Sequence, residues 1–229
     1  NCEKSFVTSA GEADLYLVST GSAAGSTPLE SDLFLVSRDR SGLEVRGRWE
    51  GLGLNGNASS PMRFQDVKLT VRDRIGAEKS GLSTMLQVCV PWFHIGVAAV
   101  NLGLAQASLD ASIQHAKSRR YEHTGQRLAD IAGIQYLLAE MSETLGAARA
   151  YLHQTARAVD EQAPDALLPL LQVKAIASEA ALQVTAKAMR VCGGAAFAKH
   201  LPVERFFRDA QAGAIMAPTN DMLKEFIGK

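Results

Sequence analysis

Hydrophobic and polar residues alternate in short runs along the first third of the chain, and Gly- and Ser-rich stretches separate these runs. Apolar side chains at every second position are typical of strands with one buried face. The sequence therefore predicts an antiparallel β-barrel or sandwich fragment built from short strands. The expected strands are residues 4–8, 13–19, 32–37, 43–49 and 61–71.

The pattern changes near Ala77, after which the strong helix formers Ala, Leu, Gln, Glu, Arg and Met predominate. Within residues 127–161, apolar residues recur every three or four positions, which places them on one face of a helix. Helices are expected at residues 82–119, 127–161, 165–191 and 202–227. Short connections between long helices favour an antiparallel bundle. The predicted fold class is α+β, with a β-domain at residues 1–76 followed by an antiparallel four-helix bundle at residues 77–229.

The 229 residues include 24 basic and 24 acidic side chains, a balance that argues against nucleic acid as a partner. Three distant cysteines and five scattered histidines predict reduced thiols and no metal site. The most apolar stretch, residues 85–104, is interrupted by Pro91 and several polar residues, so we expect no membrane insertion. No signal peptide is recognised, and we expect a cytoplasmic protein.

Two glycine motifs have a structural explanation beside a functional one. Residues 51–56 fit the dinucleotide pattern GxGxxG, but no helix is predicted after them, which favours a loop between strands. Gly193 and Gly194 follow a predicted helix, where glycine is common as a C-cap. Bare glycine backbone would also let an extended cofactor lie against the turn. Taken alone, this pair favours the helix cap.

His94 lies in the apolar segment formed by residues 90–95. If this segment is buried, desolvation lowers the pKa of the imidazole. A neutral imidazole at this position is a candidate general base. No nucleophile elbow or paired-carboxylate site is recognised elsewhere in the sequence.

Several segments, taken in order, resemble the acyl-CoA dehydrogenase family. The motifs are Lys4-Ser-Phe-Val-Thr8 with residues 9–14, Arg48 to Leu54 with Phe64-Gln-Asp-Val67, Leu102 to Arg119, Arg190-Val-Cys-Gly-Gly194, and Pro202 to Asp209. Each motif is weak alone, but their order and spacing are specific. The resemblance spans nearly all of the chain and covers part of the middle β-domain plus the C-terminal helical domain. It implies that the chain begins inside the β-domain, whose first half would be missing.

The resemblance implies noncovalently bound FAD between the β-domain and the helices. Phe6 matches a tryptophan that packs against the flavin, and Thr8 matches a threonine that hydrogen-bonds the flavin ring. Arg119 matches the arginine that pairs with the FAD diphosphate, a charge-assisted contact. The cofactor-binding residues implied by the resemblance are Phe6, Thr8, Arg119, Gly193, Gly194 and Thr219.

The same resemblance implies an acyl-CoA substrate, oxidised at its α and β carbons with hydride transfer to flavin N5. It also implies a homodimer or homotetramer in which a neighbouring subunit reaches the pyrophosphate and adenosine end of FAD. The relation to the family therefore predicts a small-molecule oxidoreductase that works as an oligomer.

The sequence departs from the family pattern at several positions. Two additional residues stand between Arg119 and Thr124-Gly125. Ala132 stands where the family has a glutamine near the cofactor, and Gln135, one turn further on, could take the place of that glutamine. Arg190 stands where the family has a second glutamine. The family's catalytic glutamate has two usual positions, and these correspond here to Ala217 with Pro218 and to Phe93. Neither side chain can accept a proton, so the catalytic base is unknown.

Three hypotheses follow from these departures. In the first hypothesis the chain belongs to a dehydrogenase whose base lies elsewhere, at His94, in an N-terminal segment or on a partner subunit. Alternatively, it is a flavin-dependent monooxygenase on the same fold, which needs no α-proton base. In the third hypothesis it is a non-catalytic subunit that pairs with a competent relative.

Overall fold

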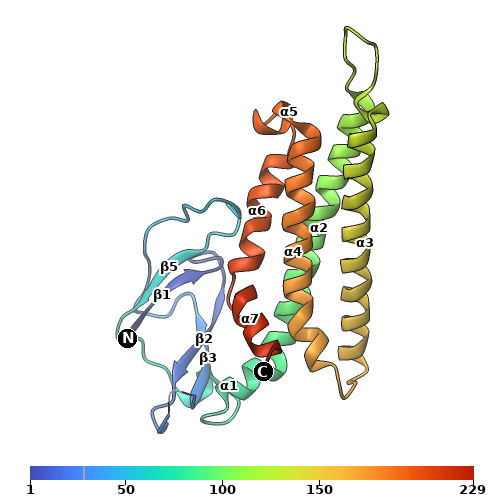
Figure 1. The fold of residues 1–229 in the computed structure, drawn as a ribbon. Coiled ribbons are helices and arrows are strands. Elements are labelled where there is room, and N and C mark those ends of the chain that lie inside the picture. The colour runs from blue at the N-terminus through green and yellow to red at the C-terminus, as the bar shows by residue number, and fades with distance from the viewer. Residues whose placement is uncertain (28) are drawn as a thin grey trace. The chain divides into compact units, whose positions relative to one another are not determined.

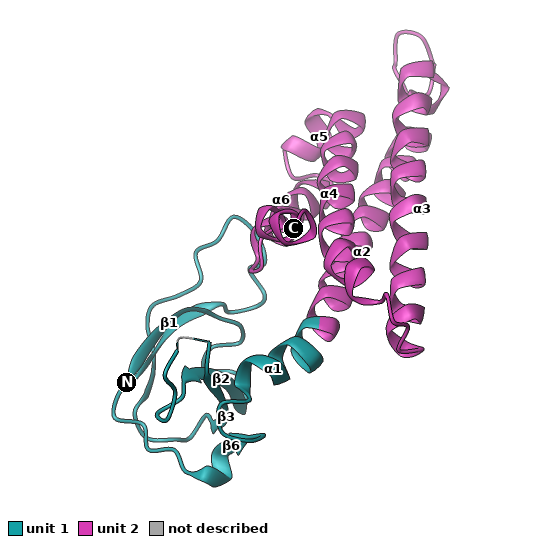
Figure 2. Cartoon of the chain, turned by 60° about the horizontal axis from the view of Figure 1, so that its bottom comes forward, with its two compact units in different colours: residues 1–90 teal, residues 91–229 magenta. Residues whose placement is uncertain are grey.

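The computed structural model describes residues 1–27 and 29–229 (Figure 1). The chain divides into two compact units, Asn1–Val90 and Pro91–Lys229, coloured separately in Figure 2. Antiparallel sheets precede a helical domain, which confirms the predicted α+β class. The first unit extends beyond residue 76 because α1 (Gly81–Thr84) packs against a strand. A Cβ on Gly81 would lie 2.7 Å from the carbonyl oxygen of Ser31.

Unit 1 contains two three-stranded antiparallel sheets, with strand orders β1-β5-β4 and β2-β3-β6. The strands are β1 (Cys2–Val7), β2 (Leu15–Gly21), β3 (Ser31–Ser37), β4 (Leu43–Val45), β5 (Ser60–Phe64) and β6 (Arg74–Ile75). In the first sheet Cys2 is paired with Phe64, and in the second Leu17 is paired with Leu35. Both sheets contribute apolar side chains to one core, which includes Val18, Val36 and Met62.

Two predicted strands are shorter in the structure than the sequence pattern indicated. The strand expected at residues 43–49 ends at Val45, and Gly47 has a φ of +75° that extended strand does not accommodate. The strand expected at residues 61–71 ends at Phe64, because Asp66 has a φ of +51°. The GxGxxG segment at residues 51–56 lies in the loop between β4 and β5, as predicted.

A helical run from Gly81 to Ser118 contains a π-helical turn, η2 (Met85–Cys89), before α2 (Val90–Ser118). Four long helices, α2, α3, α4 and α6, run side by side in unit 2 (Figure 1). The bounds of the other three long helices are α3 (Ala132–Asp160), α4 (Leu167–Cys192) and α6 (Val203–Ile215). The shorter helices are α5 (Gly194–Phe197) and α7 (Asn220–Ile227), and the 3₁₀ turns are η1 (Val71–Asp73) and η3 (Leu128–Asp130). Their shared core includes Leu102, Met141, Leu145, Val184 and Ala210.

The helix expected at residues 202–227 is two helices in the structure, so this prediction was wrong. Helix α6 ends at Ile215, and α7 begins at Asn220. Pro218 lies between them, where its ring disfavours helical backbone at the preceding residue and supplies no N–H donor. The connection Met216–Thr219 results from this break.

Two helical stretches, Gly81–Ser118 and Leu167–Cys192, have the length and mean hydropathy of a membrane span. Both contribute buried residues to the bundle, among them Ala105 and Val184. Core helices of soluble proteins have the same length and composition, so these features do not identify a membrane segment.

Candidate functional site

Phe6 and Thr8 lie at the end of β1 in unit 1. The Phe6 side chain is 78% exposed and makes an edge-on contact with the Trp49 ring, with 6.4 Å between ring centroids. The Thr8 hydroxyl lies 3.4 Å from that of Ser59. The end of this strand therefore presents an exposed aromatic ring and, two residues later, a hydroxyl, the two groups that the resemblance implied for flavin binding.

A hollow of about 400 Å³ lies beside these residues. Phe6 and Thr8 contribute to its lining, together with residues of β2 and with Phe64 of β5. Lys4 also lines it, and the Lys4 ammonium donates to the carbonyl oxygen of Ser19 over 3.2 Å. Unit 1 therefore combines apolar surface with a cationic group in one concave region.

Arg119 follows the last turn of α2 and begins a small hairpin that contains the two additional residues. The backbone N–H of Leu128 donates to the Arg119 carbonyl oxygen over 2.9 Å, and that of Tyr121 donates to Gln126 over 3.0 Å. Gly125 supports the tight turn with a φ of +68°. The Arg119 side chain is exposed, and its guanidinium makes no ion pair with any described residue. It thus remains free to bind an anion.

Gly193 ends α4 with φ +52° and ψ −133°, a conformation that favours glycine. A Cβ on Gly193 or Gly194 would have no other heavy atom within 4 Å, so open space adjoins this backbone. Gly193 therefore serves as a helix cap, and the space beside the two glycines also leaves room for a ligand. The Cys192 thiol lies 3.6 Å from the Ser112 hydroxyl in the last part of α2. The glycines and Arg119 thus belong to the same end of the bundle (Figure 1).

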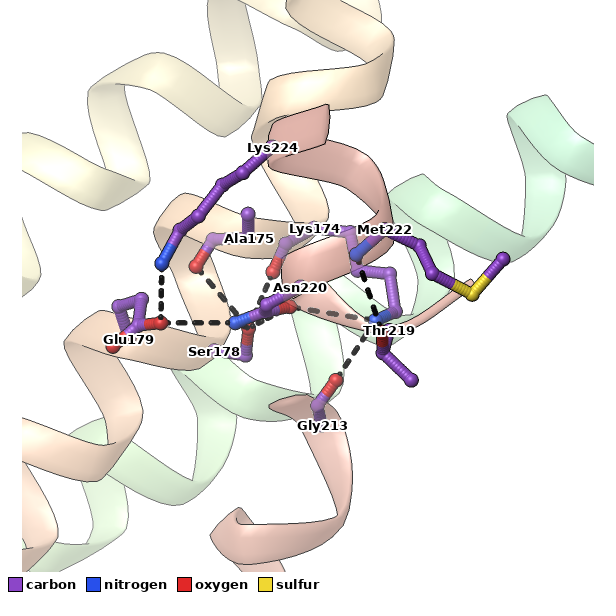
Figure 3. A network of polar contacts seen from close by, with 9 residues as sticks. All are labelled: Lys174, Ala175, Ser178, Glu179, Gly213, Thr219, Asn220, Met222 and Lys224. Atoms are coloured by element: carbon purple, nitrogen blue, oxygen red, sulfur yellow. Dashed lines mark hydrogen bonds and ion pairs between the residues drawn. The ribbon is translucent and has the colours of Figure 1, made fainter. Parts of the chain in front are cut away.

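Thr219 is the N-cap of α7, where its hydroxyl oxygen accepts a hydrogen bond from the Met222 N–H over 3.3 Å. It lies in a polar network with Lys174 near the beginning of α4 (Figure 3). At about 1.5 Å per residue, Lys174 and Gly193 are roughly 28 Å apart along α4. Thr219 is therefore remote from Gly193 and Gly194 within one chain.

The two positions at which the resemblance implied the family's usual base carry no ionisable side chain. Phe93 is 37% exposed on α2, and Ala217 is exposed in the connection between α6 and α7. His94 is fully buried, and its Nδ1–H donates to the Leu170 carbonyl oxygen over 2.9 Å. Burial lowers the pKa of His94, as predicted, and the Lys174 charge lowers it further. Because the ring has no exposed surface in the described chain, its burial argues against His94 as the base.

Two other positions flagged by the sequence lie on the helices of unit 2. Gln135 is exposed in the first turns of α3, where its amide donates to the Ala129 carbonyl oxygen over 2.9 Å. Arg190 is exposed in the last turn of α4, close to Gly193 in sequence. The bundle end that carries Arg119 and the glycines thus has a second arginine.

Sequence reasoning missed the polar network around Lys174. A signal was present, because this lysine and Gln172 are the only polar residues between Leu167 and Ala177 on a predicted helix. A lysine is almost never fully buried without partners. Its position in this apolar segment therefore pointed to specific acceptors.

The comparisons identify the family. Residues 1–67 match the acyl-CoA dehydrogenase middle domain, and residues 80–229 match the acyl-CoA dehydrogenase C-terminal domain. The chain therefore belongs to the acyl-CoA dehydrogenase family.

Similar proteins cover the whole chain. Cyclohex-1-ene-1-carbonyl-CoA dehydrogenase of Geobacter metallireducens is 30% identical over an alignment of 232 positions, which covers 100% of this chain and 60% of that protein. Short/branched chain specific acyl-CoA dehydrogenase of Rattus norvegicus is 31% identical over 100% of this chain and 52% of its own length. The structure of butyryl-CoA dehydrogenase from Megasphaera elsdenii has a TM-score of 0.92 at 28% identity, covering 100% of this chain and 58% of that one. The chain thus spans little more than half the length of these relatives.

The residues present fit FAD in their chemistry. A guanidinium without an internal partner suits a diphosphate, and open space beside Gly193 and Gly194 admits a ligand against the backbone. The exposed Phe6 ring offers an apolar surface for a planar ring system. Within the described chain, no contact of these groups would prevent them from contacting FAD.

Proposed function

We propose that this chain forms part of an FAD-dependent oxidoreductase that oxidises an acyl-CoA between its α and β carbons. One observation carries the proposal, namely the bundle end at which the unpaired Arg119 guanidinium accompanies the open backbone of Gly193 and Gly194. This combination suits the diphosphate of a dinucleotide. Membership of the acyl-CoA dehydrogenase family over nearly the whole chain supports it.

The distance between Thr219 and the glycines supports an oligomer. Thr219 lies by the connection that Lys174 contacts, and Lys174 is roughly 28 Å from Gly193 along α4 by helical rise. In a homodimer or homotetramer, Thr219 would contact one FAD, whereas Arg119 and the glycines would contact the FAD of a neighbouring subunit. Each cofactor would then depend on two copies of the chain.

FAD, when bound, supplies the acceptor for the hydride that leaves the β carbon of the acyl chain. Arg119 would neutralise the diphosphate of an FAD. On unit 1 the Phe6 ring would pack on a flavin, and the Thr8 hydroxyl would donate to it. The proton on the α carbon needs a base, which neither Ala217 nor Phe93 can be. The base of the dehydrogenase therefore comes from another segment of the protein or from a partner subunit.

An anaerobic titration of the purified, FAD-loaded protein with a panel of acyl-CoAs tests the proposal. We expect the flavin absorbance to bleach with at least one acyl-CoA, and the strongest bleaching to define the chain length accepted. Bleaching that requires a separate reductase, followed by hydroxylation when oxygen is admitted, would instead indicate a monooxygenase. Protein that folds but binds no FAD and turns over no acyl-CoA would indicate a non-catalytic subunit.

A further inference from the structure

Lys174 places an ammonium group in the interior of the helical unit, with no exposed surface. Its Nζ donates to the carbonyl oxygens of Gly213 and Pro218 over 2.9 and 2.8 Å. The Asn220 side-chain oxygen lies 3.5 Å away, at the limit of a hydrogen bond. An ammonium has three N–H donors, so these three acceptors use all of them.

The three acceptors belong to one stretch of chain. Gly213 lies in the last turn of α6, Pro218 in the connection, and Asn220 at the beginning of α7. Carbonyl groups at the C-terminal end of a helix carry partial negative charge, which suits a cation. Lys174 therefore contacts the chain before, within and after the connection Met216–Thr219.

Neighbouring residues on α4 hold the beginning of α7 as well (Figure 3). The Asn220 amide donates to the Ser178 hydroxyl over 2.9 Å and to the Glu179 carboxylate over 3.2 Å. Lys224 on α7 pairs with the same carboxylate over 3.2 Å. Polar contacts from α4 thus orient Asn220, the residue directly after Thr219.

Two apolar residues at this connection are not buried in the core. Ile215, just before it, is 73% exposed, and Ala217 within it is exposed. Burying an ammonium is costly, and a methionine of similar length would fill the same space without that cost. The polar contacts of Lys174 are therefore best explained by the geometry that they impose on the connection.

We propose that Lys174 is a positioning residue, which holds the connection Met216–Thr219 against α4 and thereby fixes the Thr219 hydroxyl for its contact with FAD. The inference rests on the proposed function, because that function makes Thr219 a cofactor contact. Lys174 itself, fully buried, contacts neither cofactor nor substrate. Its effect passes through the backbone carbonyls of Gly213 and Pro218.

Hydrogen–deuterium exchange of the purified protein without FAD tests the first half of this inference. In Lys174→Met, amide exchange in residues 213–222 should rise by about 10-fold or more, since hydrogen bonds to a charged donor are lost. Exchange in α3 should stay unchanged. Lys187→Met is the matched control, because Lys187 also lies on α4 but pairs with Glu140 of α3 over 3.1 Å. Equal exchange of residues 213–222 in both variants would overturn the proposal.

FAD affinity, measured by fluorescence titration, tests the second half. We expect the dissociation constant to rise by about 10-fold in Lys174→Met and to stay near the wild-type value in Lys187→Met. Faster exchange of residues 213–222 with unchanged FAD affinity would overturn the positioning role. A folded wild-type protein that binds no FAD would instead overturn the proposed function and, with it, the role of Lys174 in FAD binding. The hydrogen–deuterium exchange experiment would still test whether Lys174 holds the connection Met216–Thr219 against α4.

Ser178→Ala provides a milder variant should Lys174→Met fail to fold. It removes the hydroxyl that the Asn220 amide donates to and leaves Lys174 in place. We expect the same local increase in exchange and the same direction of change in FAD affinity, both smaller. Unchanged exchange and affinity in this variant would contradict the inference.

Discussion

Gly213 on α6 lies directly against the side-chain amide of Asn101 on α2. A Cβ on Gly213 would come within 2.4 Å of the Asn101 Oδ1 atom, closer than real side chains approach. Asn101 has little freedom to withdraw, because its Nδ2 donates to the Val97 carbonyl oxygen over 2.8 Å and its side chain is buried. The close approach of α6 to α2 therefore requires glycine at position 213.

Gly213→Ala should lower the free energy of unfolding by about 1–3 kcal/mol, since the added methyl overpacks the contact with Asn101. Thermal or denaturant unfolding measures this change. Gly146→Ala is the control, because position 146 in the interior of α3 has open space around its Cβ. There alanine should raise stability by up to about 1 kcal/mol. A Gly213→Ala variant as stable as the wild type would contradict the tight contact.

Arg119→Ala should weaken FAD binding by about 10- to 100-fold, because a charge-assisted contact to the diphosphate is lost. Stability without FAD should change little, since this guanidinium makes no ion pair within the described chain. Fluorescence titration with FAD measures the affinity. Arg157→Ala removes an exposed arginine near the end of α3 and serves as the control. Equal affinity in the two variants would remove Arg119 from the cofactor site.

His94 should make the protein less stable in acid. Because burial lowers its pKa below 6.5 in the folded state, the unfolded chain binds a proton that the folded chain does not. The contribution is complete above about pH 6.5 and is lost as the pH falls toward the lowered pKa. Unfolding measured from pH 8 to pH 5 should show this loss in the wild type and a weaker one in His94→Gln.

His153→Gln, at an exposed position on α3, is the matched control and should keep the wild-type pH dependence. In a folded His94→Gln variant we also expect flavin reduction by acyl-CoA to persist, because His94 is enclosed. Loss of reduction together with retained FAD and fold would show that the imidazole reaches the substrate after all.

Lys174 should affect stability at alkaline pH in a predictable direction. Burial lowers the pKa of Lys174 from 10.5 to about 8. Between these values the unfolded chain holds the proton and the folded chain loses it, so stability from this group rises as the pH increases. The free energy of unfolding should rise by about 3 kcal/mol in total, because each unit of difference between the unfolded and folded pKa contributes about 1.4 kcal/mol.

The difference in unfolding free energy between wild type and Lys174→Met, followed from pH 7.5 to 10.5, isolates this contribution. Other groups that titrate in this range, such as the buried Cys192 thiol with its raised pKa, are common to both proteins and cancel. A difference that stays flat across the range would place the Lys174 pKa outside it.

Much of the fold could be predicted from the periodicity of the sequence. Alternation of apolar and polar residues indicated the strands of unit 1, and the spacing of Leu145 and its apolar neighbours indicated α3. Both patterns lie within one segment of the sequence, so they can be recognised without knowing which distant residues pack against it. The strand ends were less predictable. The strand β5 (Ser60–Phe64) stops before Asp66, which adopts a positive φ in the loop that follows.

The candidate site depends on the sequence and on the tertiary structure in different ways. The sequence by itself determined which residues match a flavin-binding pattern, such as Arg119 and Gly193, because these depend on residue type and order along the chain. Only the tertiary structure decided that His94 is enclosed and that Lys174 holds the connection before α7. Whether a polar group is buried depends on what packs around it, and its partners here come from residues more than 30 positions away: His94 meets Leu170, and Lys174 meets Gly213 and Pro218.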